Sequence, residues 1–147
     1  MANIIQRILV RTDLGFTNGL MAAQVAHIHM EGLRWAINRN EDNSLKNIPK
    51  SKLTANLRNS TESMEFHDWL KTPYIFVHGV SCPEVLEYYC EKAEKGGIFI
   101  ARWHDTVYVN VSENQKMVFP DTFVGASLGP CDSDLIKAVI SDLPLLK

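Results

Sequence analysis

The chain has 147 residues, 46% of them hydrophobic, which is enough for one compact domain with its own core. Its formal net charge is −2 and its pI about 6.2, so bulk charge argues against a high-affinity binder of polyanions. The three cysteines form no CxxC pair, no N-terminal leader pattern is present, and no apolar run approaches the roughly 18 residues of a membrane span. These features predict a reduced, cytoplasmic protein with a single domain, residues 1–147.

The first part of the chain predicts a strand followed by a long helix. Ile4–Leu14 is rich in β-branched and other apolar residues, which is typical of a buried strand. Thr17 or Asn18 can cap a helix that continues to about Asn38, because apolar residues recur there at helical spacing. Open α/β sheets often build their sites where a strand turns into a helix.

The remaining segments alternate between strand and helix patterns. In chain order they are a polar loop or irregular insertion at Arg39–Ser60, a short helix at Thr61–Lys71, a strand at Tyr74–Val80, a helix from Pro83 to the Gly96-Gly97 pair and a third strand at Ile98–Trp103. His104–Val111 alternates as either a continuation of that strand or a hairpin arm. Pro120-Asp121 indicates a turn, and a last strand at Thr122–Leu128 precedes a closing helix at Asp132–Leu143. This order predicts an α/β fold, a three-layer α/β/α arrangement with a mixed four- or five-stranded β-sheet.

The sharpest signatures of catalysis are absent from the sequence. There is no Walker A loop, no GxGxxG after the first strand, no HExxH helix and no GxSxG elbow. His27 and His29 are two residues apart, so on a helix they point to different faces and cannot share a metal ion. We therefore expect neither a metal site nor a cofactor.

Two stretches can still carry chemistry. The first, RTDLGFTNGLMAAQVAHIHM (Arg11–Met30), ends a strand and opens a helix that carries Gln24 and His27 on one face. Amide hydrogens at the start of such a helix attract an anion. The second is WHDT at residues 103–106, where Asp105 at the end of the third strand can orient water or act as a base. If the first and third strands are parallel neighbours, both stretches open onto the same edge of the sheet.

The sequence resembles the type-2 peptidyl-tRNA hydrolases, the archaeal and eukaryotic class with a small mixed-sheet α/β/α fold. The resemblance rests on VRTDL (Val10–Leu14), GLMAAQVAH (Gly19–His27) and LGPCDSDLIKAVISDLPLL (Leu128–Leu146). Tyr74–Asp105 also fits the family's strand, helix and strand that ends in a functional aspartate. The resemblance covers most of the chain apart from Arg39–Lys71. It implies hydrolysis of the ester between peptide and tRNA, without a known metal requirement.

The activity of this family is tied to a lysine at the start of the first helix, an aspartate after the third strand and threonines near the last strand. The aspartate matches Asp105, and Arg11 and Asp13 also match. The predicted site residues fall into two groups: catalytic Asp105, Gln24, His27 and Thr122, and substrate-binding Arg11, Asp13, Gly19 and Leu20.

Other positions depart from the family pattern. The lysine position is Leu20, which cannot bind a phosphate, donate a proton or pair with the aspartate. The first threonine position falls on Val109. The second falls on Thr122 or Val124, because the Asn110–Phe119 loop is longer than usual.

Five of the predicted site residues also have a structural alternative. Asp105 can cap a surface loop, and Gln24 can fix the first loop through a hydrogen bond. His27 can simply pack near the sheet, as helix histidines often do. Arg11 and Asp13 can pair with each other.

Two functions therefore fit the sequence. In the first, the protein is an esterase for peptidyl-tRNA or a related aminoacyl ester: Asp105 positions or activates water, amides near Gly19 and Leu20 hold a phosphate or the oxyanion, and Lys116 replaces the missing lysine. In the second, it is a binding or regulatory protein on the same fold that has lost hydrolysis, which Leu20 and Val109 favour.

The expected partners follow from the same resemblance. They are tRNA or peptidyl-tRNA, and a second copy of the chain in a homodimer. The apolar residues of His104–Val111 are the contact expected for that homodimer.

Overall fold

The computed structural model describes residues 4–41, 69–71 and 73–146. Most of the predicted Arg39–Ser60 loop and of the Thr61–Lys71 helix therefore lies outside the described residues. Of these two segments, residues 39–41 are the last turn of a helix rather than the start of a loop, and residues 69–71 are helical.

Four strands form one mixed sheet. They are β1 (Ile4–Arg11), β2 (Ile75–Val80), β3 (Ile100–Ser112) and β4 (Gln115–Asp132). Their order across the sheet is β2-β1-β4-β3, with β1 parallel to β2 and β4 antiparallel to both β1 and β3. The first and third strands are thus parallel, but they are not neighbours, because β4 lies between them.

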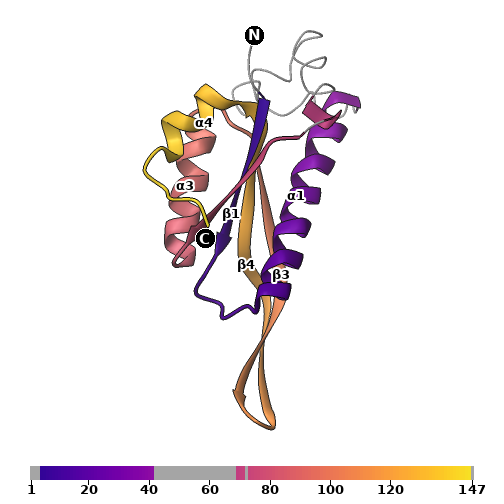
Figure 1. Ribbon diagram of the computed structural model, residues 1–147, viewed down its shortest axis with the longest axis vertical. Helices are drawn as coiled ribbons and strands as arrows, with labels where there is room; N and C mark the ends of the chain where they lie inside the picture. Colours follow the sequence, from indigo (N-terminus) through magenta and orange to yellow (C-terminus); the bar gives the residue numbers. More distant parts are fainter. Residues whose placement is uncertain (1–3, 42–68, 72, 147) are drawn as a thin grey trace.

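Helices cover both faces of the sheet (Figure 1). α1 (Asn18–Glu41) lies on one face, whereas α3 (Pro83–Lys95) and α4 (Ser133–Ile140) lie together on the other. This arrangement confirms the predicted α/β fold with helices on both faces, and the sheet has four strands. None of the helices in the described ranges is long and apolar enough to cross a bilayer.

Capping residues set the helix ends close to their predicted positions. Thr17 caps α1 through its hydroxyl group, and Pro83 occupies the first turn of α3. Gly97, with a φ of 82°, follows the end of α3 in a conformation that favours glycine. Asp132 caps α4, which ends at Ile140 rather than at the predicted Leu143.

Alternation along β1 divides the core between the two faces of the sheet. Ile8 and Val10 pack with Ile28 of α1, whereas Ile5 and Leu9 face α3 and α4. Burying each of these side chains contributes about 1.5–3 kcal/mol. The Ile28 contact fixes α1 on the sheet, and with it the helix turn that precedes Ile28.

β3 and β4 continue beyond the start of α1 as a two-stranded arm, residues 107–119 (Figure 1). His104–Val111 therefore continues the third strand, as one of the two interpretations held. The prediction of a turn at Pro120-Asp121 is wrong, because the chain turns at residues 113–114. Pro120 and Asp121 instead oppose Thr106 as a β-bulge inside β4. Asp121 has a φ of 54° there, and a bulge tolerates the missing N–H of Pro120.

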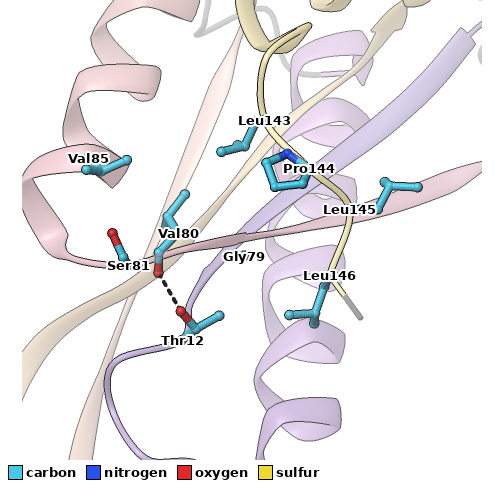
Figure 2. A pocket seen from close by; sticks show the side chains of 9 residues that line it. All are labelled: Thr12, Gly79, Val80, Ser81, Val85, Leu143, Pro144, Leu145 and Leu146. Carbon is cyan, nitrogen blue, oxygen red and sulfur yellow. Dashed lines mark hydrogen bonds between the residues drawn. The ribbon is translucent and has the colours of Figure 1, made fainter.

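The last described residues run beside the edge strand β2. The Leu146 N–H donates to the Val77 carbonyl at 2.8 Å. An open cavity of about 260 Å³ lies between this tail and the ends of β1 and β2 (Figure 2). Its lining is mostly apolar: Thr12, Gly79, Val80, Ser81, Val85, Leu143, Pro144, Leu145 and Leu146. None of these nine residues is titratable, so the cavity offers no group for acid–base chemistry.

Two histidines with restricted access to water connect distant parts of the fold. Arg7 Nη1 lies 3.1 Å from His78 Nε2. Because a guanidinium can only donate, Nε2 accepts, and Nδ1 donates to two backbone carbonyls of the C-terminal tail. His29 on α1 bonds a buried glutamine of β1 at 2.6 Å. Burial lowers the pKa of both imidazoles from the ordinary value of 6.5.

We expect the free energy of unfolding to fall as the pH drops below 6.5. Because each pKa is lower in the folded protein, the unfolded chain binds more protons in this range, at a cost of up to about 1.4 kcal/mol per pH unit per histidine. Well above 6.5 both states hold neutral imidazoles and the dependence disappears. Urea titrations across this range measure it. His78→Gln should give a flatter profile than the wild-type protein. A slope equal to that of the wild type would contradict the assignment.

Candidate active site

Asp105 lies where β3 passes the first turns of α1. Its Oδ2 accepts a hydrogen bond from Gln24 Nε2 at 3.0 Å, and its Oδ1 accepts one from the Thr106 backbone N–H at 2.8 Å. These two bonds fix the plane of the carboxylate. An ionised carboxylate accepts about four hydrogen bonds, so about two of its lone-pair positions remain for a ligand or water. The two chemistry-bearing stretches of the sequence therefore meet in space.

Trp103 fixes the orientation of Gln24. The indole N–H donates to Gln24 Oε1 at 2.9 Å. Since an indole can only donate, the amide must turn its NH₂ group toward Asp105. Gln24 is only 7% exposed, so this chain of bonds is shielded from competing water. The carboxylate is thus held in place by a neutral amide rather than by a cation.

His27 lies one helical turn beyond Gln24 and stacks on Trp103. The two ring centroids are 5.2 Å apart and the interplanar angle is 14°. The imidazole is exposed, which puts it within reach of a ligand at the rim of the site. Gln24, and not His27, bonds Asp105, so a catalytic role for His27 stays a prediction.

Thr122 lies directly opposite Asp105 in the β3–β4 ladder and shares its face of the sheet. Its hydroxyl donates to the Phe119 carbonyl at 2.9 Å, across the bulge. Val124, the other candidate for this threonine position, is fully buried in the core under α1. Thr122 is therefore the threonine beside the carboxylate, and its catalytic role stays a prediction.

Arg11 and Asp13 pair with each other at the end of β1. Arg11 Nη2 and Nε donate to the Asp13 carboxylate at 2.7 and 2.9 Å, and Nη1 donates to the Phe123 carbonyl at 3.1 Å. The hydrogen bonds from Arg11 hold the pKa of Asp13 below its ordinary value of 3.8. Arg11 and Asp13 thus form the ion pair that was their structural alternative. Contact of either residue with a substrate stays a prediction.

Gly19 and Leu20 belong to the first turn of α1. The Leu20 N–H donates to the Thr17 hydroxyl at 3.3 Å, so the Gly19 N–H is the better placed of the two for an anion. The Leu20 side chain is 51% exposed and precedes Gln24 by four residues, which puts both on one stripe of the helix. The position that carries a lysine in the family pattern thus presents an apolar side chain at the edge of the site.

Lys116 cannot replace that lysine, so this expectation is wrong. Lys116 pairs with Asn110 near the tip of the arm, whereas Asp105 pairs with Thr122 at its base. The six intervening steps along β4 correspond to about 20 Å at about 3.3 Å per residue. His104 lies on the opposite face of the sheet from Asp105. It stacks on Phe123 on the α3 face, with 5.0 Å between ring centroids.

The sequence reasoning missed the positioning role of Trp103. The sequence signal for this role is that Trp103 precedes Asp105 by two residues, because residues two apart on a strand share one face. In the described part of the chain, no group of three or more His, Cys, Asp or Glu side chains is arranged to hold a metal ion. What the site offers is one oriented carboxylate, a threonine hydroxyl and the first amides of a helix.

The fold and the site define a small α/β/α protein in which the Asp105 carboxylate is oriented beside the first turns of α1. Comparison with protein families adds that the model described as Peptidyl-tRNA hydrolase PTH2 matches residues 4–146. The chain therefore belongs to the peptidyl-tRNA hydrolase PTH2 family. A search of curated proteins finds no match.

Proposed function

We propose that the protein hydrolyses the ester that links a peptide to the terminal ribose of tRNA. Family membership supports this substrate. The observation that carries the proposal is the Asp105 carboxylate, which Gln24 and the Thr106 N–H hold beside the start of α1. A carboxylate fixed in this way, with lone pairs left over, is suited to bind one water molecule and accept its proton.

The proposed step needs only water as co-reactant. Asp105 accepts a proton while the water oxygen bonds to the ester carbonyl carbon. The Thr122 hydroxyl donates its own hydrogen bond to the Phe119 carbonyl, so its oxygen can accept a hydrogen bond from the same water. The Gly19 N–H donates to the developing oxyanion. The bond to the ribose oxygen then breaks, and the proton on Asp105 passes to that leaving oxygen. A general base of this kind contributes about 10²–10⁴-fold to the rate.

We place this activity in the cytoplasm, in a protein of one domain. The free cysteines Cys82, Cys90 and Cys131 fit a reducing compartment. Burial raises the pKa of Cys90 to about 12, so this thiol stays protonated and unreactive.

Leu20 favours a second function, which is binding without hydrolysis. An exposed leucine near Asp105 supplies neither a proton nor a charge for the phosphates of tRNA. On this alternative the protein keeps the fold and the Trp103–Gln24–Asp105 chain of bonds but holds a ligand without cleaving it.

Turnover of one peptidyl-tRNA by the wild-type protein and by Leu20→Lys separates the two functions. We expect wild-type turnover, and an increase in kcat/KM of up to about fivefold in Leu20→Lys, the factor for about 1 kcal/mol of exposed ion pairing. Leu145→Lys is the matched control, because Leu145 is also 51% exposed but lies on the C-terminal tail. No wild-type turnover, together with turnover gained in Leu20→Lys, would reject hydrolysis and favour the binding function.

A further inference from the structure

Exposed apolar side chains lie on the arm next to Asp105 and in the first turn of α1. The arm itself extends beyond the start of α1 (Figure 1). We use the term arm surface for four side chains: Leu20, Val109, Met117 and Phe119. Leu20, Met117 and Phe119 are 51%, 49% and 43% exposed. Val109 is partly buried against the core under α1. Exposed apolar side chains that gather on one face of a protein often mark a binding site.

The register of the arm places this surface on the same face of the sheet as the Asp105 carboxylate. Met117 pairs with Val109, and Phe119 pairs with Val107, so both lie on the Asp105 face of the sheet. Phe119 and Thr122 are three residues apart and would face opposite sides of a regular strand. The bulge between them restores a common face. The Val107 and Val109 rungs lie about 7 and about 13 Å along β3 from Asp105.

The arm surface carries no cation. Lys116 is the one Lys or Arg between Asp105 and Thr122 in the sequence, and it alternates with Met117, so it faces the other side of the arm. At the base of the surface, Leu20 stands where the family pattern has a lysine. Such a surface cannot compensate the charge of a phosphate, but it can bury apolar side chains.

We propose that the arm surface binds the peptide part of the substrate and favours apolar side chains in the residues next to the ester. This proposal rests on the proposed function, which requires the ester carbonyl to lie at Asp105. An extended peptide places alternate side chains about 7 Å apart, which matches the spacing of the rungs. On this proposal the chain discriminates between substrates by their peptide part.

Two substrates on the same tRNA test this preference: N-acetyl-leucyl-leucyl-tRNA and N-acetyl-glycyl-glycyl-tRNA. We expect kcat/KM to be at least about tenfold higher for the leucyl substrate, the usual effect of apolar contacts in a pocket. Phe119→Ser and Met117→Ser should each reduce this ratio. Val118→Ser is the matched control, because Val118 is 52% exposed on the opposite face of the same strand and should leave the ratio unchanged. Equal rates on both substrates, or the same reduction in Val118→Ser, would overturn the proposal.

A binding measurement separates this proposal from the proposed function. If no peptidyl-tRNA is hydrolysed, the proposed function fails. The affinities for N-acetyl-dileucyl-amide and N-acetyl-diglycyl-amide then test whether the arm surface binds peptide. Tighter binding of the leucyl amide that Phe119→Ser abolishes supports a peptide surface, whereas equal affinities overturn it. Sedimentation could instead show a dimer that the Met117→Ser substitution dissociates. That result would assign the surface to a second copy of the chain and also overturn the proposal.

Discussion

Asp105→Asn is expected to lower kcat/KM for peptidyl-tRNA by about 10²–10⁴-fold, the contribution of a single general base. An asparagine cannot accept the proton of the attacking water. It also turns an NH₂ group toward either Gln24 Nε2 or the Thr106 N–H, and both of these groups are donors, so one hydrogen bond of the site is lost. Initial rates on one peptidyl-tRNA measure the effect on catalysis, and urea titration measures the effect on folding.

A double variant separates the lost base from the lost hydrogen bond. In Asp105→Asn combined with Gln24→Glu, the introduced carboxylate accepts from both Trp103 and the new asparagine, so the network is complete again with carboxylate and amide exchanged. We expect its stability to return toward that of the wild type while its rate stays low. Recovery of the rate would mean that catalysis does not require a base at position 105.

Gly125→Ala is expected to destabilise the fold by about 3 kcal/mol, at the upper end of the cost of overpacking a core. A Cβ at this position of β4 would lie 2.4 Å from the Leu9 carbonyl oxygen and 2.4 Å from Ile28 Cδ1. The Leu9 oxygen belongs to the backbone of a neighbouring strand and cannot rotate away. The sheet or α1 must therefore shift, and because Ile28 lies one turn after Gln24, the shift also disturbs the hydrogen bond to Asp105.

Gly19→Ala provides the control for this stability measurement. A Cβ on Gly19 meets no atom within 4 Å, and the residue lies in the first turn of α1. Replacing glycine by alanine in a helix stabilises it by up to about 1 kcal/mol. Urea titrations should therefore move in opposite directions for the two variants. A Gly125→Ala protein as stable as the wild type would contradict the tight contact between β4 and α1.

Local patterns in the sequence predicted most of the elements. The apolar run at Ile4–Leu14 and the capping residue Thr17 placed β1 and α1 to within a few residues. Pro83 and the Gly96-Gly97 pair delimited α3 in the same way. The three-residue spacing of Gln24 and His27 indicated that they share a helix face, and in the structure both contact Trp103.

The parts that the sequence could not predict depend on contacts between distant residues. No local sequence pattern predicts that β4 lies between β1 and β3, because strand order is set by packing of the whole sheet. Pro120-Asp121 has the composition of a turn, and only its pairing opposite Thr106 makes it a bulge. Lys116 is close to Asp105 in sequence, but the length of the arm separates them in space.

The indole of Trp103 makes the site optically observable. It donates to Gln24 on one side and stacks with His27, so any ligand that displaces either residue changes the polarity around the ring. The chain has three tryptophans, and a version that retains only Trp103 would emit from the site alone. Its intrinsic fluorescence would then follow occupancy in real time without a labelled substrate, and would distinguish a ligand that enters the site from one that binds elsewhere.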